Sequence, residues 1–502
     1  MKGRLRLFSL SNNLDSLLAA LIGFLLIQIY SKHSGIGVSP DSVAYISAAR
    51  HLVHGNGFLS FDNLPTVDFP FGYPFFLTIL SFFSGLDPLQ FGPWLNGLLF
   101  GLLIYCSGVM MNGFSNPSGW YKRILLLCIV MSPALQEVYS MLWSETVFLL
   151  LIFLFIIAIS NYLKQKTMKW LLISVCICAL TCICRYAGVF LVFTGLAVVF
   201  FNKGNPWPKK MKHCLIFGIF SVSFLLVNII RNLSETGFTT GMRPKSGTGI
   251  LKILEYFGAV FCEWLLLNSR PTLAVLLALF VLFIFTLTIG YTWRRFKNLH
   301  SFEFLVGLTG LIYSAFMLLS NSIIRYEQFT GRLLSPLYIP LLWSLSWWIP
   351  SYISSRSLRM KWIIGITVLI GASWFLNIQL RSDYEYYDGV KDAGIPGYRE
   401  DPFIKSEFVQ YINKNKPDLK SGYRIYSNAA DAFYFITDQP ALQLPINEFP
   451  SKLQEYYLMD HNYLIWFDSL YNSDMPDLHT ILKNKNMVLL NQLSDGAVYI
   501  TK

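Results

Sequence analysis

Charged residues are scarce in this chain of 502 residues. They make up 14% of it, against about 25% in an ordinary soluble domain. That shortage excludes a single water-soluble globule. Cysteine is limited too, because only eight occur and none follows Leu380. The last 122 residues therefore cannot hold a disulfide framework.

Four of the cysteines lie close together in one apolar run, at Cys176, Cys178, Cys182 and Cys184. A metal site is the alternative to simple packing. At about 3.6 residues per helical turn, however, these four side chains do not converge on one face. We therefore expect them to pack inside a helical bundle.

The positive charge is uneven along the chain. The whole chain has 40 basic and 29 acidic residues, a net charge of +11. Up to Leu380 there are 28 basic and 12 acidic residues, whereas the rest has 12 and 17. Since the basic residues gather in short clusters between apolar runs, they resemble the loops of a polytopic membrane protein. Nucleic-acid binding is therefore not expected.

Long apolar runs are abundant, and a membrane-spanning helix needs about 20 such residues. The hydropathy pattern predicts about eleven spans, near 14–30, 90–111, 123–140, 144–162, 169–184, 187–202, 213–230, 271–291, 303–320, 333–350 and 362–380. The apolar run 72–86 is short and is flanked by prolines, so we expect a surface or re-entrant segment there.

Clusters of Lys and Arg then fall at every second connection, which predicts a cytoplasmic N-terminus and an external C-terminus in the cell membrane. The expected organisation is a transmembrane domain, 1–380, with a first external loop at 31–89, and an external (periplasmic) domain at 381–502. The latter has turn signals and β-type runs at 423–427, 463–467, 487–490 and 497–501. These runs alternate with helical stretches, which predicts a small α/β domain.

Two carboxylates recur near the external boundary. Asp41 follows Pro40 in the first external loop, and Glu145 begins a span. An ionisable group at this depth has a high free-energy cost when it faces lipid, so its presence indicates a functional role. The alternative is structural, because a carboxylate in the first turn of a helix also interacts favourably with the helix dipole.

Two arginines are expected on the same side, Arg185 where two spans meet and Arg332 where another begins. A lone interfacial arginine commonly extends to the lipid headgroups. Two of them on the side that disfavours positive charge are better explained as ligands for a phosphate. Carboxylates beside such cations suit transfer of a group from a lipid phosphate to an acceptor. Composition alone would equally permit a transporter.

The order of these motifs resembles the GT-C glycosyltransferases, and within them the protein O-mannosyltransferase and lipid A aminoarabinose transferase group. The similar segments are Asp41 to Ala49, His54 to Gly57, Phe69 to Pro74, Ser144 to Phe148, Cys184 to Tyr186 and Gly331 to Tyr338. Two positions depart from the pattern. Ser42 replaces the Glu that follows the Asp in the mannosyltransferases, and Tyr186 replaces a Pro.

The resemblance implies a role for each site residue. Asp41 would be the catalytic base or would orient the acceptor, and Glu145 would be a second catalytic carboxylate. Arg185 and Arg332 would bind the donor phosphate. Candidate substrate contacts are Tyr45, His54, Tyr73, Tyr326 and Glu327. Some members of the family bind a divalent metal ion, for which Asp41 and Glu145 would be the candidate ligands here.

The implied function is transfer of a sugar, with inversion, from a polyprenyl-phosphate donor to an external glycan, lipid or protein acceptor. Two alternatives remain open. One is a ligase for larger lipid-linked glycans, and the other is a lipid or sugar flippase. A transporter usually shows internal repeats and polar residues near the midplane, whereas here the ionisable residues gather at the external boundary.

Overall fold

The computed structural model describes residues 13–502 except 203–204, 297–298, 326–327, 416–418 and 420–421. The chain divides into two compact units. Unit 1 comprises residues 1–30, 68–73 and 93–388, and unit 2 comprises 31–67, 74–92 and 389–502. The segment expected as the first loop, 31–89, and the C-terminal region thus belong mainly to the same unit.

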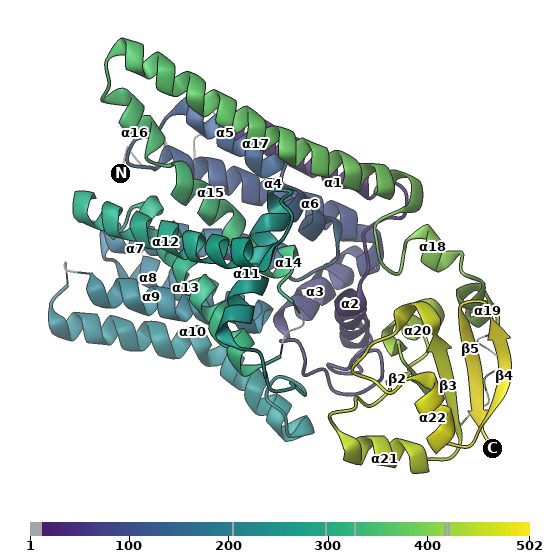
Figure 1. Cartoon of the computed structure of the whole chain (residues 1–502). Helices are drawn as coiled ribbons and strands as arrows, with labels where there is room; N and C mark the ends of the chain where they lie inside the picture. Colours follow the sequence, from purple (N-terminus) through teal and green to yellow (C-terminus); the bar gives the residue numbers. More distant parts are fainter. Residues whose placement is uncertain (1–12, 203–204, 297–298, 326–327, 416–418, 420–421) are drawn as a thin grey trace. The chain divides into compact units, whose positions relative to one another are not determined.

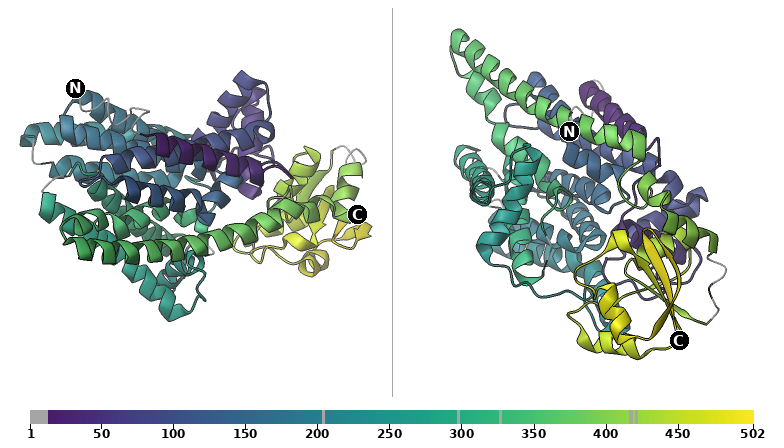
Figure 2. Two further views of the ribbon diagram at one scale, coloured as in Figure 1. Left: turned by 90° about the horizontal axis from the view of Figure 1, so that it is seen from above. Right: turned by 45° about the vertical axis from the view of Figure 1, so that its right-hand side comes forward.

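Unit 1 is helical, and its long helices lie side by side (Figures 1 and 2). Its helices in the described residues are α1 (Leu14–Tyr30), α4 (Pro88–Asn112, which begins in unit 2), α5 (Gly119–Val130), α6 (Pro133–Ser140), α7 (Glu145–Gln165), α8 (Met168–Cys184), η2 (Tyr186–Gly188), α9 (Val189–Phe201), α10 (Trp207–Thr236), α11 (Ile250–Trp264), α12 (Pro271–Phe296), α13 (Phe302–Ile323), α14 (Gly331–Leu334), η3 (Ser335–Leu337), α15 (Tyr338–Ser346), α16 (Ile349–Ser354) and α17 (Leu358–Ala393).

Within the described ranges, six helices are long and apolar enough to cross a membrane: α4, α7, α10, α12, α13 and α17. The pair α5 and α6, bent by 50°, makes up to seven. The bend precedes Pro133, which cannot continue the hydrogen bonding of α5. Shorter apolar helices lie at Leu14–Tyr30, Gly72–Ser84, Met168–Cys184 and Tyr186–Phe201. The chain thus has the architecture of a multi-pass membrane protein.

Three segments differ from the sequence-based expectation. The run expected to span at 333–350 is divided among α14, η3 and α15, because Pro336 and Pro340 each lack a backbone N–H donor. The stretch between the spans expected at 213–230 and 271–291 contains α11, whose Ile253, Phe257 and Phe261 recur every four residues and are buried. Lys252, Glu255 and Glu263 lower the hydropathy of this segment. Finally, α17 continues to Ala393 instead of ending near 380.

The apolar run 72–86 forms α3 (Gly72–Ser84). At 13 residues and about 1.5 Å per residue, it is shorter than the roughly 30 Å hydrocarbon layer. This length fits the expected short segment.

Unit 2 contains α2 (Pro40–Val53), most of α3 and the C-terminal region. That region has α18 (Asp401–Ile404), α19 (Glu407–Asn415), α20 (Ala430–Thr437), α21 (Pro450–Leu458), η5 (Asp468–Leu470) and α22 (Leu478–Asn484). Its strands are β1 (Arg424–Ser427), β2 (Leu442–Gln443), β3 (Asn462–Phe467), β4 (Met487–Leu493) and β5 (Gly496–Thr501).

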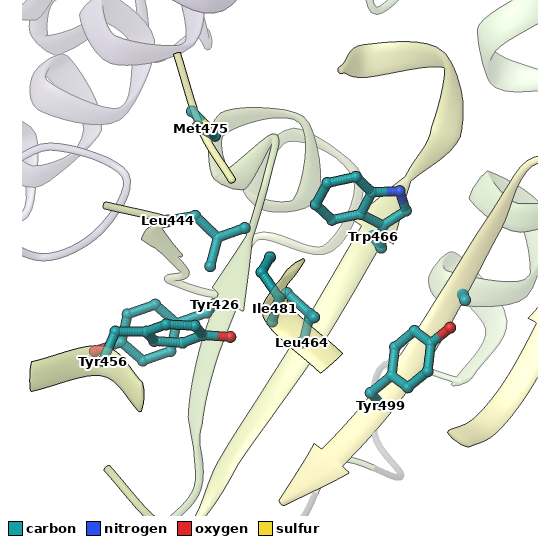
Figure 3. Close-up of a cluster of buried hydrophobic side chains, with 9 residues drawn as sticks. Tyr426, Leu444, Tyr456, Leu464, Trp466, Met475, Ile481 and Tyr499 are labelled. Carbon is teal, nitrogen blue, oxygen red and sulfur yellow. The ribbon is translucent and has the colours of Figure 1, made fainter. Parts of the chain in front are cut away.

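The five strands form one sheet in the order β2-β1-β3-β5-β4. The pairs β2–β1 and β1–β3 are parallel, and β5 is antiparallel to both β3 and β4. The four expected β runs correspond to β1, β3, β4 and β5, whereas β2, with two residues, is too short to show a period. Aromatic and aliphatic side chains from the sheet and its neighbours, including Tyr426, Trp466 and Ile481, form the buried core shown in Figure 3.

Candidate active site

Glu145 is the first residue of α7, directly after the N-cap Ser144. Its side chain is only 2% exposed. A carboxylate at this position interacts favourably with the helix dipole. However, the free-energy penalty for burying a charge is far larger than the stabilisation by the helix dipole, unless the charge is paired and hydrogen-bonded.

Both predicted arginines supply that pairing. Arg185 Nη1 lies 2.6 Å from Glu145 Oε2 and donates to Ser144 Oγ at 2.8 Å. Arg332 donates through Nε to Glu145 Oε1 at 2.5 Å and through Nη2 to Oε2 at 3.2 Å. The structure therefore brings three of the four main predicted site residues together in unit 1.

The group of Glu145, Arg185 and Arg332, here called the arginine–glutamate triad, carries a net charge of +1. The aromatic rings of Phe148 and Trp143 flank the guanidinium groups, with the Arg332 Cζ 4.0 Å from the centre of the Trp143 ring. Cation–π contact and the shared carboxylate hold the two arginines in place. In this geometry Glu145 acts as the group that positions two cations.

Arg185 follows the last residue of α8, and its extended backbone (φ −148°, ψ 140°) ends that helix. The end of α8 is packed tightly against the start of α3. A Cβ atom added to Gly72 would lie 2.6 Å from the carbonyl oxygen of Ile183. The motif from Phe69 to Pro74 therefore contacts the turn that carries Arg185, and only glycine allows this close approach.

We expect Gly72→Ala to displace the end of α8 and with it Arg185. Such overpacking should destabilise the protein by about 1–3 kcal/mol, measured by thermal unfolding in detergent. Gly290→Ala in α12 is the matched control, because a Cβ there meets no atom within 4 Å. An unfolding temperature for Gly72→Ala equal to that of the wild type would contradict this packing argument.

Arg332 lies in the single turn of α14, which Thr330 caps by accepting from Leu333 N. The helix cannot extend regularly because Pro336 follows. The Tyr313 hydroxyl donates to the Leu333 carbonyl oxygen at 2.7 Å, and Ser335 Oγ donates to that of Arg332 at 2.8 Å. These bonds hold the broken segment, so Arg332 is presented from a fixed turn.

Two cavities lie close to this turn in unit 1. The larger, about 410 Å³, is almost entirely apolar and lies among α5, α11, α12, α15 and α17. The smaller, about 180 Å³, is lined by Gly331 and by polar side chains that include Glu137, Glu263 and Gln379. Trp264 and Tyr338 line both cavities. An apolar space thus adjoins a polar one beside the residue that precedes Arg332.

Asp41 belongs to unit 2, where it lies in the first turn of α2 and is partly exposed. The start of α2 does not depend on the Asp41 carboxylate, because the Ser39 backbone N–H donates to Ser42 Oγ at 3.1 Å. Tyr45 and Ala48, expected on the same helical face, are buried. Asp41 is therefore on a well-packed helix with its first turn capped by other residues.

The remaining candidate substrate contacts lie in different environments. Tyr45 is 2% exposed and Tyr73 is 1% exposed. His54 is exposed at the end of α2, and its Nδ1 lies 2.7 Å from the Arg50 carbonyl oxygen. Tyr326 and Glu327 lie outside the described residues.

A metal ion was a further expectation for Asp41 and Glu145. Within the described part of the chain, no group of three or more His, Cys, Asp or Glu side chains is arranged to hold one. Both Glu145 oxygens accept hydrogen bonds from arginine. Glu145 therefore does not fit the role of metal ligand, and we assign no step to a metal.

One group near the site was not predicted. Tyr186, next to Arg185, accepts hydrogen bonds from Asn228 and Asn232 of α10 at 3.4 and 3.1 Å. Asn232 begins a sequence that resembles a glycosylation acceptor, yet it is fully buried. In the folded protein it is a structural residue. The spacing of one helical turn between Asn228 and Asn232 is the feature of the sequence that could have indicated this structural role.

No family model and no curated protein sequence matches the chain. Its structure is similar to that of ArnT from Cupriavidus metallidurans bound to undecaprenyl phosphate, with 11% identity, a TM-score of 0.58 and 97% of each chain covered. The apo state of the same protein gives 12% identity, a TM-score of 0.56 and the same coverage. Since the likeness runs over nearly the whole of both chains, this protein shares the fold of that ArnT, which agrees with the membrane fold that the ordered motifs implied.

Proposed function

We propose that the protein is an integral membrane glycosyltransferase that takes a sugar from a polyprenyl-phosphate donor and passes it to an acceptor outside the cell membrane. The observation that carries this proposal is the arginine–glutamate triad. Two partly buried guanidinium groups that share one buried carboxylate leave a net positive charge, and arginine is suited to bind phosphate oxygens in pairs.

The bonds to Glu145 support this reading quantitatively. A guanidinium group has five N–H donors, and Glu145 receives one hydrogen bond or ion-pair contact from Arg185 and two from Arg332. A carboxylate has about four acceptor positions, whereas the two guanidinium groups together have about ten N–H donors. We therefore propose that the phosphate binds both arginines while they remain paired with Glu145.

The cavities support an amphiphilic donor. The 410 Å³ apolar cavity suits a hydrocarbon chain, and the adjoining polar cavity leads to Gly331. The ArnT structure, which has the same fold, was solved with undecaprenyl phosphate bound.

In this mechanism Asp41 takes the proton of the acceptor hydroxyl or amine as that group attacks the anomeric carbon of the sugar. The bond from the anomeric carbon to the phosphate oxygen breaks, and its electron pair leaves with the polyprenyl phosphate. Arg185 and Arg332 stabilise the charge that develops on that phosphate. A single displacement inverts the anomeric configuration. We further propose that the N-terminus is cytoplasmic and that residues 381–502 are external.

The test is donor consumption by the purified protein in lipid nanodiscs. A panel of polyprenyl-phosphate sugars is offered with a crude acceptor extract, and free polyprenyl phosphate is followed by mass spectrometry. Arg332→Ala is compared with Arg381→Ala, because Arg381 is exposed and pairs with Glu385 on the surface of α17. We expect release from one donor, lost in Arg332→Ala and retained in Arg381→Ala.

Release that is equal in the two variants would contradict the role of Arg332. If the folded wild-type protein releases polyprenyl phosphate from none of the donors, the transferase proposal fails in favour of a glycan ligase or a flippase.

A further inference from the structure

The segment that leads into α2 is held along its length by the C-terminal region of the same unit. Ile395 N donates to Ser34 Oγ at 3.1 Å, and Tyr398 N donates to the Val38 carbonyl oxygen at 2.9 Å. A Cβ added at Gly35, which has φ +77°, would lie 2.7 Å from Arg399 Nη1. The two segments are thus in close contact, and residues 31–39 have little freedom of their own.

Tyr398 connects this segment to a second place in the C-terminal region. Its side chain is buried, and its hydroxyl donates to Asp431 Oδ2 at 2.6 Å. Its backbone N–H holds Val38, only three residues before Asp41. A continuous path of two hydrogen bonds therefore runs from Asp431 through Tyr398 to the backbone that precedes Asp41.

Asp431 is itself fixed by the turn between β1 and α20. Ala429 N donates to Ser427 Oγ at 3.0 Å, and Ala430 N donates to Gln443 Oε1 at 3.0 Å. The side-chain amide of Asn428 donates to the Phe467 carbonyl oxygen in β3 and accepts a hydrogen bond from the Phe467 backbone N–H. Each bond ties the turn to the sheet, so Asp431 is presented from a rigid base and not from a loose loop.

The same helix α20 also holds the far end of α2. The two helices pack against each other. Arg50, in the last turn of α2, donates to Asp438 at 3.0 Å just after α20 ends, and to Asp87 at 2.7 Å. The helix that carries Asp41 is therefore fastened at both ends to the C-terminal region.

We propose that Asp431 and Tyr398 are positioning residues for Asp41, and that the C-terminal region serves the reaction by holding the helix of the base. This inference rests on the proposed function, since it assigns the purpose of the contacts to the Asp41 chemistry. The contacts themselves, and the restraint that they place on residues 31–41, are features of the structure and do not depend on the proposed function.

The electrostatics agree with this placement. Burial raises the pKa of Asp431, and the nearby negative charge of Asp41 raises it further. A buried carboxyl beside a like charge is costly, so its place in the fold needs a compensating group. The Tyr398 hydroxyl supplies one, which explains why a tyrosine and not a phenylalanine occupies this position.

The experiment compares Tyr398→Phe with Tyr456→Phe in the full-length protein. Tyr456 belongs to the C-terminal core, and its buried hydroxyl has no hydrogen-bond partner among the described residues. We expect Tyr398→Phe to speed amide hydrogen exchange in residues 33–45 and to lower kcat about tenfold or more, with KM for the donor unchanged. Tyr456→Phe should leave both within twofold of the wild type.

Two further variants test whether the effect passes through the named groups. Asp431→Ala removes the acceptor and should speed exchange like Tyr398→Phe, whereas Asp431→Asn keeps an acceptor oxygen and should preserve protection. In an Asp41→Asn background, Tyr398→Phe should cause no further loss of rate, because a positioning residue acts only through the group that it positions.

Unchanged exchange in residues 33–45 and unchanged kcat in Tyr398→Phe would overturn the inference. A full additional loss in the Asp41→Asn background would overturn it as well. Failure of the wild-type protein to transfer any sugar would instead refute the proposed function, and the exchange data would still decide whether Asp431 and Tyr398 order the Asp41 segment.

Discussion

Asp41→Asn should lower the rate of sugar transfer by about 10²- to 10⁴-fold, the usual contribution of a general base. Asparagine keeps the size of the side chain and can still accept a hydrogen bond, but it cannot take a proton at neutral pH. Because the donor phosphate is assigned to Arg185 and Arg332, binding of the donor should not change. Steady-state transfer and equilibrium binding of undecaprenyl phosphate measure the two quantities separately.

The fold should tolerate this substitution. The first turn of α2 is capped through Ser39 and Ser42, so that cap remains when the Asp41 charge is removed, and the lost interaction with the helix dipole costs about 0.3–1 kcal/mol. Asp62→Asn is the control, since Asp62 lies in the same loop and accepts a hydrogen bond from Leu64 N in its own turn. A rate within threefold of the wild type in Asp41→Asn would remove Asp41 from the mechanism.

Glu145→Gln should destabilise the protein by about 3 kcal/mol, the lower end for a buried pair, because it leaves two partly buried guanidinium groups without the carboxylate that balances them. Thermal unfolding in detergent measures the loss. Undecaprenyl phosphate should restore more stability to this variant than to the wild type, since the phosphate supplies the missing negative charge to the same two arginines.

Glu385→Gln is the matched control. Glu385 pairs with Arg381 on the exposed surface of α17, 3.4 Å away, and an exposed pair of this kind contributes about 0–1 kcal/mol. Equal unfolding temperatures for the two variants would show that the arginine–glutamate triad is not a buried charge cluster. An equal response of Glu145→Gln and the wild type to undecaprenyl phosphate would separate the arginines from the donor.

The sequence allowed prediction of the fold and of three residues that meet in the site. Apolar length and Lys/Arg clusters indicated a helical membrane protein, and Glu145, Arg185 and Arg332 were each conspicuous as charges near one boundary. Their pairing could not be predicted, because it depends on which helix ends are neighbours in space. The two arginines were expected to be ligands for a phosphate. In the structure both of them are paired with Glu145.

The contribution of the C-terminal region was not predictable in the same way. Tyr398 and Asp431 belong to no motif, and their importance arises only from contact with Val38 and α2, hundreds of residues earlier. By contrast, the interruption near Arg332 had a visible cause in Pro336 and Pro340. The interruption of a helix by proline could be predicted from the sequence, whereas contacts between residues far apart in the chain could not.

The contact between Val38 and Tyr398 joins residues that are 360 positions apart in the chain. At about 5–20 residues per second, synthesis takes roughly 20–70 s to reach the second partner after the first has been made. During that interval α2 lacks the C-terminal groups that hold it in the folded protein. The helix that carries Asp41 is thus among the first parts of the protein to be synthesised and among the last to gain all its contacts, so a ribosome that stops early releases a chain in which this helix lacks its C-terminal partners.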